Sequence, residues 1–257
     1  MATLEQVRRE YDSQAEGYND ISHLPRNVLK AQLLEAALGD CTGLHVLDLG
    51  GGPGLEARQA ISAGAATVDI VDLSDEMLRV ALETEEKLGR SGRVRGFQAD
   101  ATQPLAPLRA RGLRDQYDLV MSNFCFDHAS TRGQLEAMWR NATDLLRPGG
   151  RFVGARVSNM RSEAGTSGKY GITYKDFHDF PGGTRYRYRV HLREPIEFEV
   201  STLELSYGGS TEIMEMCGLT EIEELPPQSA KTVRDDPEFW DLFLRDPSIA
   251  VVKAVKK

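Results

Sequence analysis

The segment from Val46 to Gly54 constrains the fold more than any other part of this sequence. It reads Val-Leu-Asp-Leu-Gly-Gly-Gly-Pro-Gly, so a short apolar run containing an acid opens into a glycine-rich turn. A buried parallel strand passes into a helix in this way, and the glycines reach positive φ and let the backbone approach a ligand. The start of the following helix adds unpaired N–H groups. The segment therefore predicts an α/β protein with a nucleotide-type cofactor site.

The spacing of the glycines distinguishes two kinds of cofactor site. A dinucleotide fingerprint requires G-x-G-x-x-G, but with Gly50 and Gly52 as its first glycines the third position falls on Leu55. The chain instead carries D-x-G-x-G-x-G, from Asp48 to Gly54. This pattern resembles motif I of the class I methyltransferases that use S-adenosylmethionine (SAM). A nicotinamide oxidoreductase is the rival that the spacing disfavours, and an ordinary tight turn in another α/β protein is the remaining alternative.

Strand-like and helix-like segments alternate along the chain, which predicts a mostly parallel, Rossmann-like sheet with helices on both faces. We expect strands at residues 44–49, 67–73, 94–99, 117–124, 151–157, 219–224 and 249–255. We expect helices at 4–18, 26–38, 55–63, 75–88, 132–146 and about 210–216. Seven strands agree with the resemblance, which also implies that the last strand runs antiparallel to the others.

Residues 159–205 interrupt this alternation and predict an inserted antiparallel hairpin after the fifth strand. Apolar and polar side chains alternate with period two over 186–192 and again over 196–200, as in half-buried strands. The hairpin would set two basic side chains against two acidic ones, namely Arg187 and Arg189 against Glu197 and Glu199. In related small-molecule enzymes such an insert covers the substrate, but a structural or dimerising flap fits the pattern nearly as well.

The 257 residues suit one domain with an appendage. We divide it into an N-terminal helical cap (1–40), a SAM-binding core (41–158), a lid insert (159–205) and C-terminal strands (206–257). The net charge of −8 argues against sequence-independent binding of nucleic acid. No apolar run is long enough for a membrane span, and the first residues lack a signal-peptide core. We therefore expect a cytoplasmic protein with a small-molecule partner and no membrane or nucleic-acid partner. A homodimer is one possible assembly, and the sequence leaves the oligomeric state open.

Metal ions and disulfides have no clear sequence signal here. The three cysteines are widely spaced and form no CxxC pair, at Cys41, Cys125 and Cys217. No cluster of His and Asp with ligand spacing is present, so we expect no metal.

Polar residues end the first four predicted strands, and the carboxyl ends of parallel strands meet at one edge of the sheet. They are Asp48, Asp72, Asp100 and Asn123. A carboxylate at Asp72 can accept both ribose hydroxyls, as in dinucleotide folds. The resemblance implies that Asp48 organises the glycine turn and that Asp100 accepts the adenine amine, although Asp100 also fits a turn.

The resemblance extends the cofactor site to neighbouring positions. Beside the four strand ends it includes Tyr18, Gly50, Gly52, Leu73, Met77, Ala101 and Phe124. A side chain at Gly50 or Gly52 would clash with the ligand. The stretch after Asn123 differs from the Asn-Pro-Pro-Tyr type of motif that methylates nitrogens in nucleic acid and protein, which disfavours those substrates.

Methyl transfer from a sulfonium has no universal catalytic motif, because the enzyme mainly aligns the reactants and excludes water. The catalytic candidates come from position, and they are Tyr11, Tyr18 and His128. His128 can act as a base near neutral pH, or it is a plain loop histidine. The substrate-binding candidates are Phe126, His128, Arg156, Tyr170 and Tyr174.

The whole chain is similar to small stand-alone methyltransferases of microbial and fungal secondary metabolism, including those like toxoflavin synthase. The resemblance implies transfer of a methyl group to N or O of a small molecule. The alternative is a SAM-binding protein of the same fold that catalyses a non-methylating reaction or serves as a partner subunit. The cofactor motifs fit both readings equally.

Overall fold

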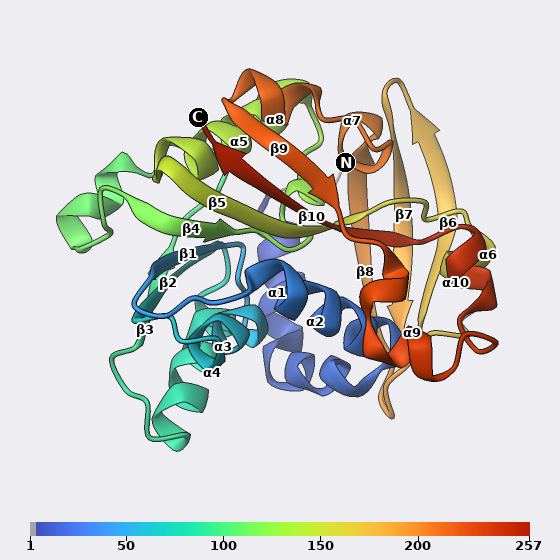
Figure 1. Cartoon of the computed structure of the whole chain (residues 1–257). Helices are drawn as coiled ribbons and strands as arrows, with labels where there is room; N and C mark the ends of the chain where they lie inside the picture. Colours follow the sequence, from blue (N-terminus) through green and yellow to red (C-terminus); the bar gives the residue numbers. More distant parts are fainter. Residues whose placement is uncertain (1–3) are drawn as a thin grey trace.

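The computed structural model describes residues 4–257 and contains two separate sheets (Figure 1). The larger sheet has seven strands in the order β3-β2-β1-β4-β5-β10-β9. These are β1 (His45–Leu49), β2 (Thr67–Asp72), β3 (Val94–Gln98), β4 (Tyr117–Met121), β5 (Leu146–Val157), β9 (Leu219–Glu224) and β10 (Ile249–Lys256). Strands β1 to β5 pair in parallel, and β10 lies antiparallel between β5 and β9. The expected fold class and the antiparallel last strand are confirmed.

Helices cover both faces of the large sheet. Alternate side chains of its strands point to opposite faces, and each face forms an apolar core with the helices that cover it. In β1, Val46 belongs to one core and Leu47 to the other, and both are fully buried. The helices α2 (Pro25–Leu38), α3 (Leu55–Ser62) and α4 (Asp75–Lys87) pack on one face. The helices α5 (Arg132–Asp144) and α8 (Glu212–Met216) pack on the other (Figure 1).

The ends of the predicted elements differ from the structure by a few residues. Strand β4 ends at Met121, so Asn123 and Phe124 lie in the loop beyond it. Helix α5 ends at Asp144, and β5 begins two residues later, at Leu146. The Ser74 hydroxyl caps α4 by accepting a hydrogen bond from the Met77 N–H, as its place before an apolar helix predicts.

The insert after β5 forms a second sheet of three antiparallel strands, in the order β6-β7-β8. They are β6 (Ile172–Phe180), β7 (Gly183–Val190) and β8 (Ile196–Leu203). In the β7–β8 hairpin Arg187 lies opposite Glu199 and Arg189 opposite Glu197, which confirms the expected pairing. Strand β6 was not predicted, because an irregular register between Lys175 and His178 breaks its period of two.

The N-terminal helix α1 (Leu4–Tyr18) and the short helix η1 (Asn19–His23) connect the two sheets. Helix α1 contacts α4 on the large sheet and β8 on the small one. The inner face of the small sheet packs on Ile21 of η1 and Leu24 before α2. The two sheets and α1 therefore enclose a space at the carboxyl ends of the parallel strands.

Several short helices were missed, because four or five residues are too few for a periodic pattern. They are α6 (Glu163–Thr166), α7 (Glu204–Tyr207), α9 (Lys231–Asp235) and α10 (Asp241–Arg245). Three more short turns of 3-10 helix are η2 (Ala106–Arg111), η3 (Phe126–His128) and η4 (Pro227–Ser229). Within the described part of the chain, no helix has the length and apolar character needed to cross a membrane.

Candidate functional site

A cavity of about 270 Å³ lies at the carboxyl ends of β1, β2 and β4, roofed by α1 and the inner face of the small sheet. Most of the expected site residues line it. These are Tyr11, Tyr18, Gly50, Gly52, Asp72, Leu73, Met77, Asp100, Ala101, Asn123, Phe124, His128 and Tyr174. Segments separated by tens of residues thus meet at one place, as the strand-end argument predicts.

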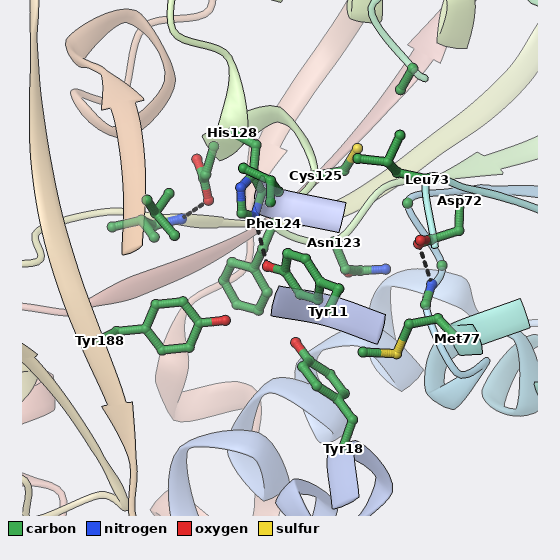
Figure 2. Close-up of a pocket in the computed structure, with 18 of the residues that line it drawn as sticks. Tyr11, Tyr18, Asp72, Leu73, Met77, Asn123, Phe124, Cys125, His128 and Tyr188 are labelled. Atoms are coloured by element: carbon green, nitrogen blue, oxygen red, sulfur yellow. Dashed lines mark hydrogen bonds between the residues drawn. The ribbon is translucent and has the colours of Figure 1, made fainter. Parts of the chain in front are cut away.

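The glycine turn and the end of β2 are joined through Asp72. Its carboxylate accepts a hydrogen bond from the Gly52 N–H at 2.8 Å (Figure 2). It also accepts one from the Ser74 N–H at 2.9 Å. Each carboxylate oxygen keeps a second lone pair, so the fixed group can still accept ligand hydroxyls. A Cβ on Gly52 would have no neighbour within 4 Å, so this glycine leaves open space beside Asp72. Burial raises the pKa of Asp72, while its backbone hydrogen bonds act in the opposite direction.

The glycine at position 50 has a second role that the sequence did not predict. A Cβ on Gly50 would lie 2.5 Å from the Cβ of Cys125, which makes a contact within the protein the reason for glycine there. Gly50 also lines the cavity, so the expected clash of a side chain with the ligand stays a prediction beside this internal one. Its φ of 72° independently favours glycine.

Asp48 lies behind the turn rather than in the cavity wall. Its side chain is fully buried, and a Cβ on Gly51 would lie 2.6 Å from its carboxylate. Neither carboxylate oxygen has a hydrogen-bond partner within the described residues. Burial, followed by the nearby Glu56 and Asp72 carboxylates, raises the pKa of Asp48. The acid therefore supports the turn from beneath.

The ends of β3 and β4 present polar groups to the cavity. Asp100 accepts hydrogen bonds from the Thr102 N–H and hydroxyl, both at 2.8 Å, so it holds a turn while lining the cavity. Asn123 accepts the Ala155 N–H at 3.0 Å through its carbonyl oxygen. The buried amide nitrogen of Asn123 has no hydrogen-bond partner among residues 4–257 and remains available as a donor.

An aromatic wall faces these polar groups. Figure 2 shows Tyr11, Tyr18, Tyr188 and Phe124 directed toward a common space, with Asp72 and Met77 at its other end. The Tyr11 hydroxyl and His128 Nε2 share a hydrogen bond of 2.9 Å. Burial lowers the pKa of His128 to about 4, so the imidazole is neutral at neutral pH. Burial also raises the pKa of Tyr11, which keeps its hydroxyl protonated.

Three expected substrate-binding residues lie outside the cavity. Phe126 packs in the core against Trp139, with ring centroids 4.1 Å apart. Tyr170 stacks on Trp240 at 4.7 Å and donates its hydroxyl to the backbone of a neighbouring loop. Arg156 lines a separate, smaller cavity beside α8 and pairs with Glu224. Each satisfies its packing or charge elsewhere, so these three expectations are wrong.

The cavity residues that were not expected from the sequence include two cations and two tyrosines, namely Arg26, Lys30, Tyr186 and Tyr188. The two cations are four residues apart and therefore lie on one face of α2, among apolar positions. This pattern was the sequence signal that could have identified them. The two tyrosines alternate along β7 and face inward together.

This geometry can be compared with known proteins. Residues 46–150 match the family described as a methyltransferase domain. That segment holds the glycine turn and the first four strands with their polar ends. The match and the fold support the resemblance to class I methyltransferases and support SAM as the cosubstrate of the site.

Sequence relatives cover only part of this chain. The malonyl-[acyl-carrier protein] O-methyltransferase of Halalkalibacterium halodurans is 28% identical over 149 residues, which are 56% of this chain and 52% of the relative. The ribosomal protein L11 methyltransferase of Sorangium cellulosum is 26% identical over 178 residues, 60% of this chain and 54% of the relative. The chain thus spans about half the length of these relatives.

Solved structures share the fold over nearly the whole chain. The CcbJ methyltransferase of Streptomyces caelestis has a TM-score of 0.63 at 18% identity, covering 96% of this chain and 98% of its own. The [4+2]-cyclase SpnF has a TM-score of 0.62 at 16% identity, covering 99% and 97%. At these identities the likeness establishes the fold alone.

Proposed function

We propose that this protein is a SAM-dependent methyltransferase that transfers a methyl group to N or O of a small molecule. The observation that carries the proposal is the joint between Asp72 and the glycine turn, at the carboxyl edge of a parallel sheet. The joint fixes an acceptor group beside the open space at Gly52. The methyltransferase-domain match over the same residues supports it independently.

The residues present fit SAM chemically. The Asp72 carboxylate can accept ribose hydroxyls, and Leu73 and Met77 offer apolar contact for the adenine. On this proposal Asp100 and the backbone at Ala101, which also line the cavity, form hydrogen bonds with the adenine amine. On this proposal the free amide donor of Asn123 faces the aminoacyl end.

SAM, when bound, supplies an electrophilic methyl group on its sulfonium sulfur, and S-adenosylhomocysteine is the leaving group. This chain must then orient the acceptor, exclude water and take up a proton if the acceptor releases one. The rings of Tyr11, Tyr18 and Tyr188 offer electron-rich faces to a cationic centre. His128 is unprotonated at neutral pH, and the Tyr11 hydroxyl holds its ring in place. Its low pKa makes it a weak acceptor for such a proton, so the proposal does not depend on His128 as a base.

The roofed cavity supports a small acceptor. Helix α1 and the strands β6, β7 and β8 contribute side chains to its wall, which leaves little room for a folded macromolecule. The relatives include enzymes named for an acyl-carrier substrate and for a ribosomal protein, so the acceptor does not follow from relatedness. We place it among small molecules, including those of secondary metabolism. One similar fold belongs to a protein named as a cyclase, which keeps a non-methylating reaction as the second candidate.

Calorimetric titration with SAM, S-adenosylhomocysteine, NAD and NADP tests the cosubstrate. We expect saturable binding of the first two alone, and binding of NAD or NADP instead would overturn the proposal. Release of S-adenosylhomocysteine is then measured over a panel of small amines, phenols and acids. Turnover of an acceptor without this release would favour the non-methylating candidate.

A further inference from the structure

Arg26 is a buried cation that has no counter-ion within the part of the chain that the structure describes. It lies in the first turn of α2, lines the cavity and is 8% exposed. Across residues 4–257, no Asp or Glu carboxylate lies within 4.0 Å of its guanidinium. A buried charge is normally paired, because removing it from water is costly. The position therefore calls for an anion from a bound ligand, since residues 4–257 do not provide one.

The guanidinium also keeps unused donors. Its Nε and one terminal nitrogen donate to the Asn27 side-chain oxygen, both at 3.3 Å. The other terminal nitrogen donates to the Tyr174 hydroxyl at 2.8 Å. Arginine has five N–H donors, so two remain after these three bonds. Tyr174 also lines the cavity and accepts from Arg26, which leaves its own O–H free to donate to a second acceptor.

Lys30, one turn further along α2, shows the contrast. Its ammonium forms a buried ion pair with Glu56, in the first turn of α3 after the glycine turn. Its charge is thus neutralised within the chain, and it lies on the side of the cosubstrate turn. Arg26 is instead tied to Tyr174 on β6, which belongs to the roof of the cavity.

We propose that Arg26 and Tyr174 form an oxyanion subsite for the methyl acceptor, which therefore carries a carboxylate or a similar anionic group. The subsite rests on the proposed function and narrows its substrate class to small acids. Two guanidinium N–H groups and the tyrosine O–H converge on the anion. Phe124, whose ring centroid is 5.3 Å from the guanidinium carbon, gives the rest of the acceptor an aromatic surface.

The test uses benzoate and benzamide as probes, because they share a shape and differ in charge. Each is titrated by calorimetry into wild-type protein saturated with S-adenosylhomocysteine. We expect benzoate to bind about tenfold to a hundredfold more tightly than benzamide, the usual size of a charge-assisted hydrogen bond to a buried partner. Arg26→Met should abolish this preference, and Tyr174→Phe should reduce it. Arg156→Met is the matched control, since it removes a guanidinium outside the cavity and should leave the preference intact.

The outcomes separate this inference from the proposed function. Equal or absent binding of the two probes to wild-type protein would overturn the subsite, and this arm requires no variant. A preference that survives Arg26→Met would overturn it as well. If Arg26→Met weakens the binding of S-adenosylhomocysteine but not that of 5′-methylthioadenosine, which lacks the aminoacyl group, the guanidinium binds the carboxylate of the cosubstrate and the inference is wrong. Failure of wild-type protein to bind S-adenosylhomocysteine would reject the proposed function. If such a protein still preferred benzoate to benzamide, the anion subsite at Arg26 and Tyr174 would nevertheless be supported.

Discussion

Replacing His128 with glutamine should change how the stability of the protein depends on pH. Burial lowers the pKa of His128 from 6.5 to about 4, so the folded protein favours the neutral ring. The resulting stability is fully present above pH 6.5 and is lost as the pH falls through 4. At 1.36 kcal/mol per pH unit, wild-type protein should lose about 3 kcal/mol relative to His128→Gln over this window.

The neighbouring Asp127 supplies a control of opposite sign. Its carboxylate accepts hydrogen bonds from the Ser206 hydroxyl and the Val157 N–H, but burial dominates and raises its pKa from 3.8 to about 6. The folded protein therefore favours the protonated acid, and stability falls as the pH rises from 3.8 to 6. Wild-type protein should lose about 3 kcal/mol relative to Asp127→Asn over that range.

The assay is urea unfolding of the ligand-free protein between pH 4 and 7, followed by tryptophan fluorescence. Differences between wild type and each variant are compared at the same pH, because this cancels the titration of all other groups. We expect the difference for His128→Gln to grow with pH and that for Asp127→Asn to shrink. A flat difference for His128→Gln would show that the imidazole is solvated in the folded protein and would refute the lowering of its pKa by burial.

Three further outcomes follow from the geometry of the site. Asp72→Ala should weaken the binding of S-adenosylhomocysteine by about 1–3 kcal/mol in calorimetry, because the Gly52 N–H and the ribose hydroxyls both lose their acceptor. An unchanged affinity would contradict the placement of the ribose at the end of β2. Gly50→Ala should lower the free energy of unfolding in urea by about 1–3 kcal/mol more than Gly52→Ala, because both positions have a positive φ but only Gly50 is overpacked on Cys125. Gly52→Ala should in addition reduce the affinity for S-adenosylhomocysteine, and equal effects of both on stability would refute the distinction. Tyr170→Phe should cost about 1 kcal/mol of stability through its lost hydrogen bond and leave cosubstrate affinity unchanged, and a fall in that affinity would return Tyr170 to the site.

The cosubstrate side of the site could be predicted from the sequence because it is built from strand ends. Once the parallel strands were identified, Asp72, Asp100 and Asn123 had to meet at one edge. The turn at residues 46–54 combined a strand pattern with glycine spacing, so local and global signals agreed. The antiparallel direction of the last strand was expected from the resemblance rather than from the pattern of the strand itself, and the structure confirms it for β10.

The acceptor side could not be predicted in the same way. Its walls come from α1, α2 and the small sheet, whose packing on the core depends on long-range contacts without a sequence motif. Tyr170 and Tyr174 are four residues apart, yet one stacks on Trp240 and the other enters the cavity. The sequence also could not indicate that Arg26 is buried without an acidic partner among the described residues, because this depends on its three-dimensional surroundings.

The place of β10 between β5 and β9 has a consequence for synthesis of the chain. Strand β5 can pair with β4 as soon as both have emerged, but its other edge stays open until Ile249–Lys256 is made, after residues 158–248. Strand edges that wait for a distant partner fold slowly and invite pairing with other chains. A nascent chain of this protein therefore carries an unprotected edge in the middle of its future sheet, where a chaperone would have the longest time to act.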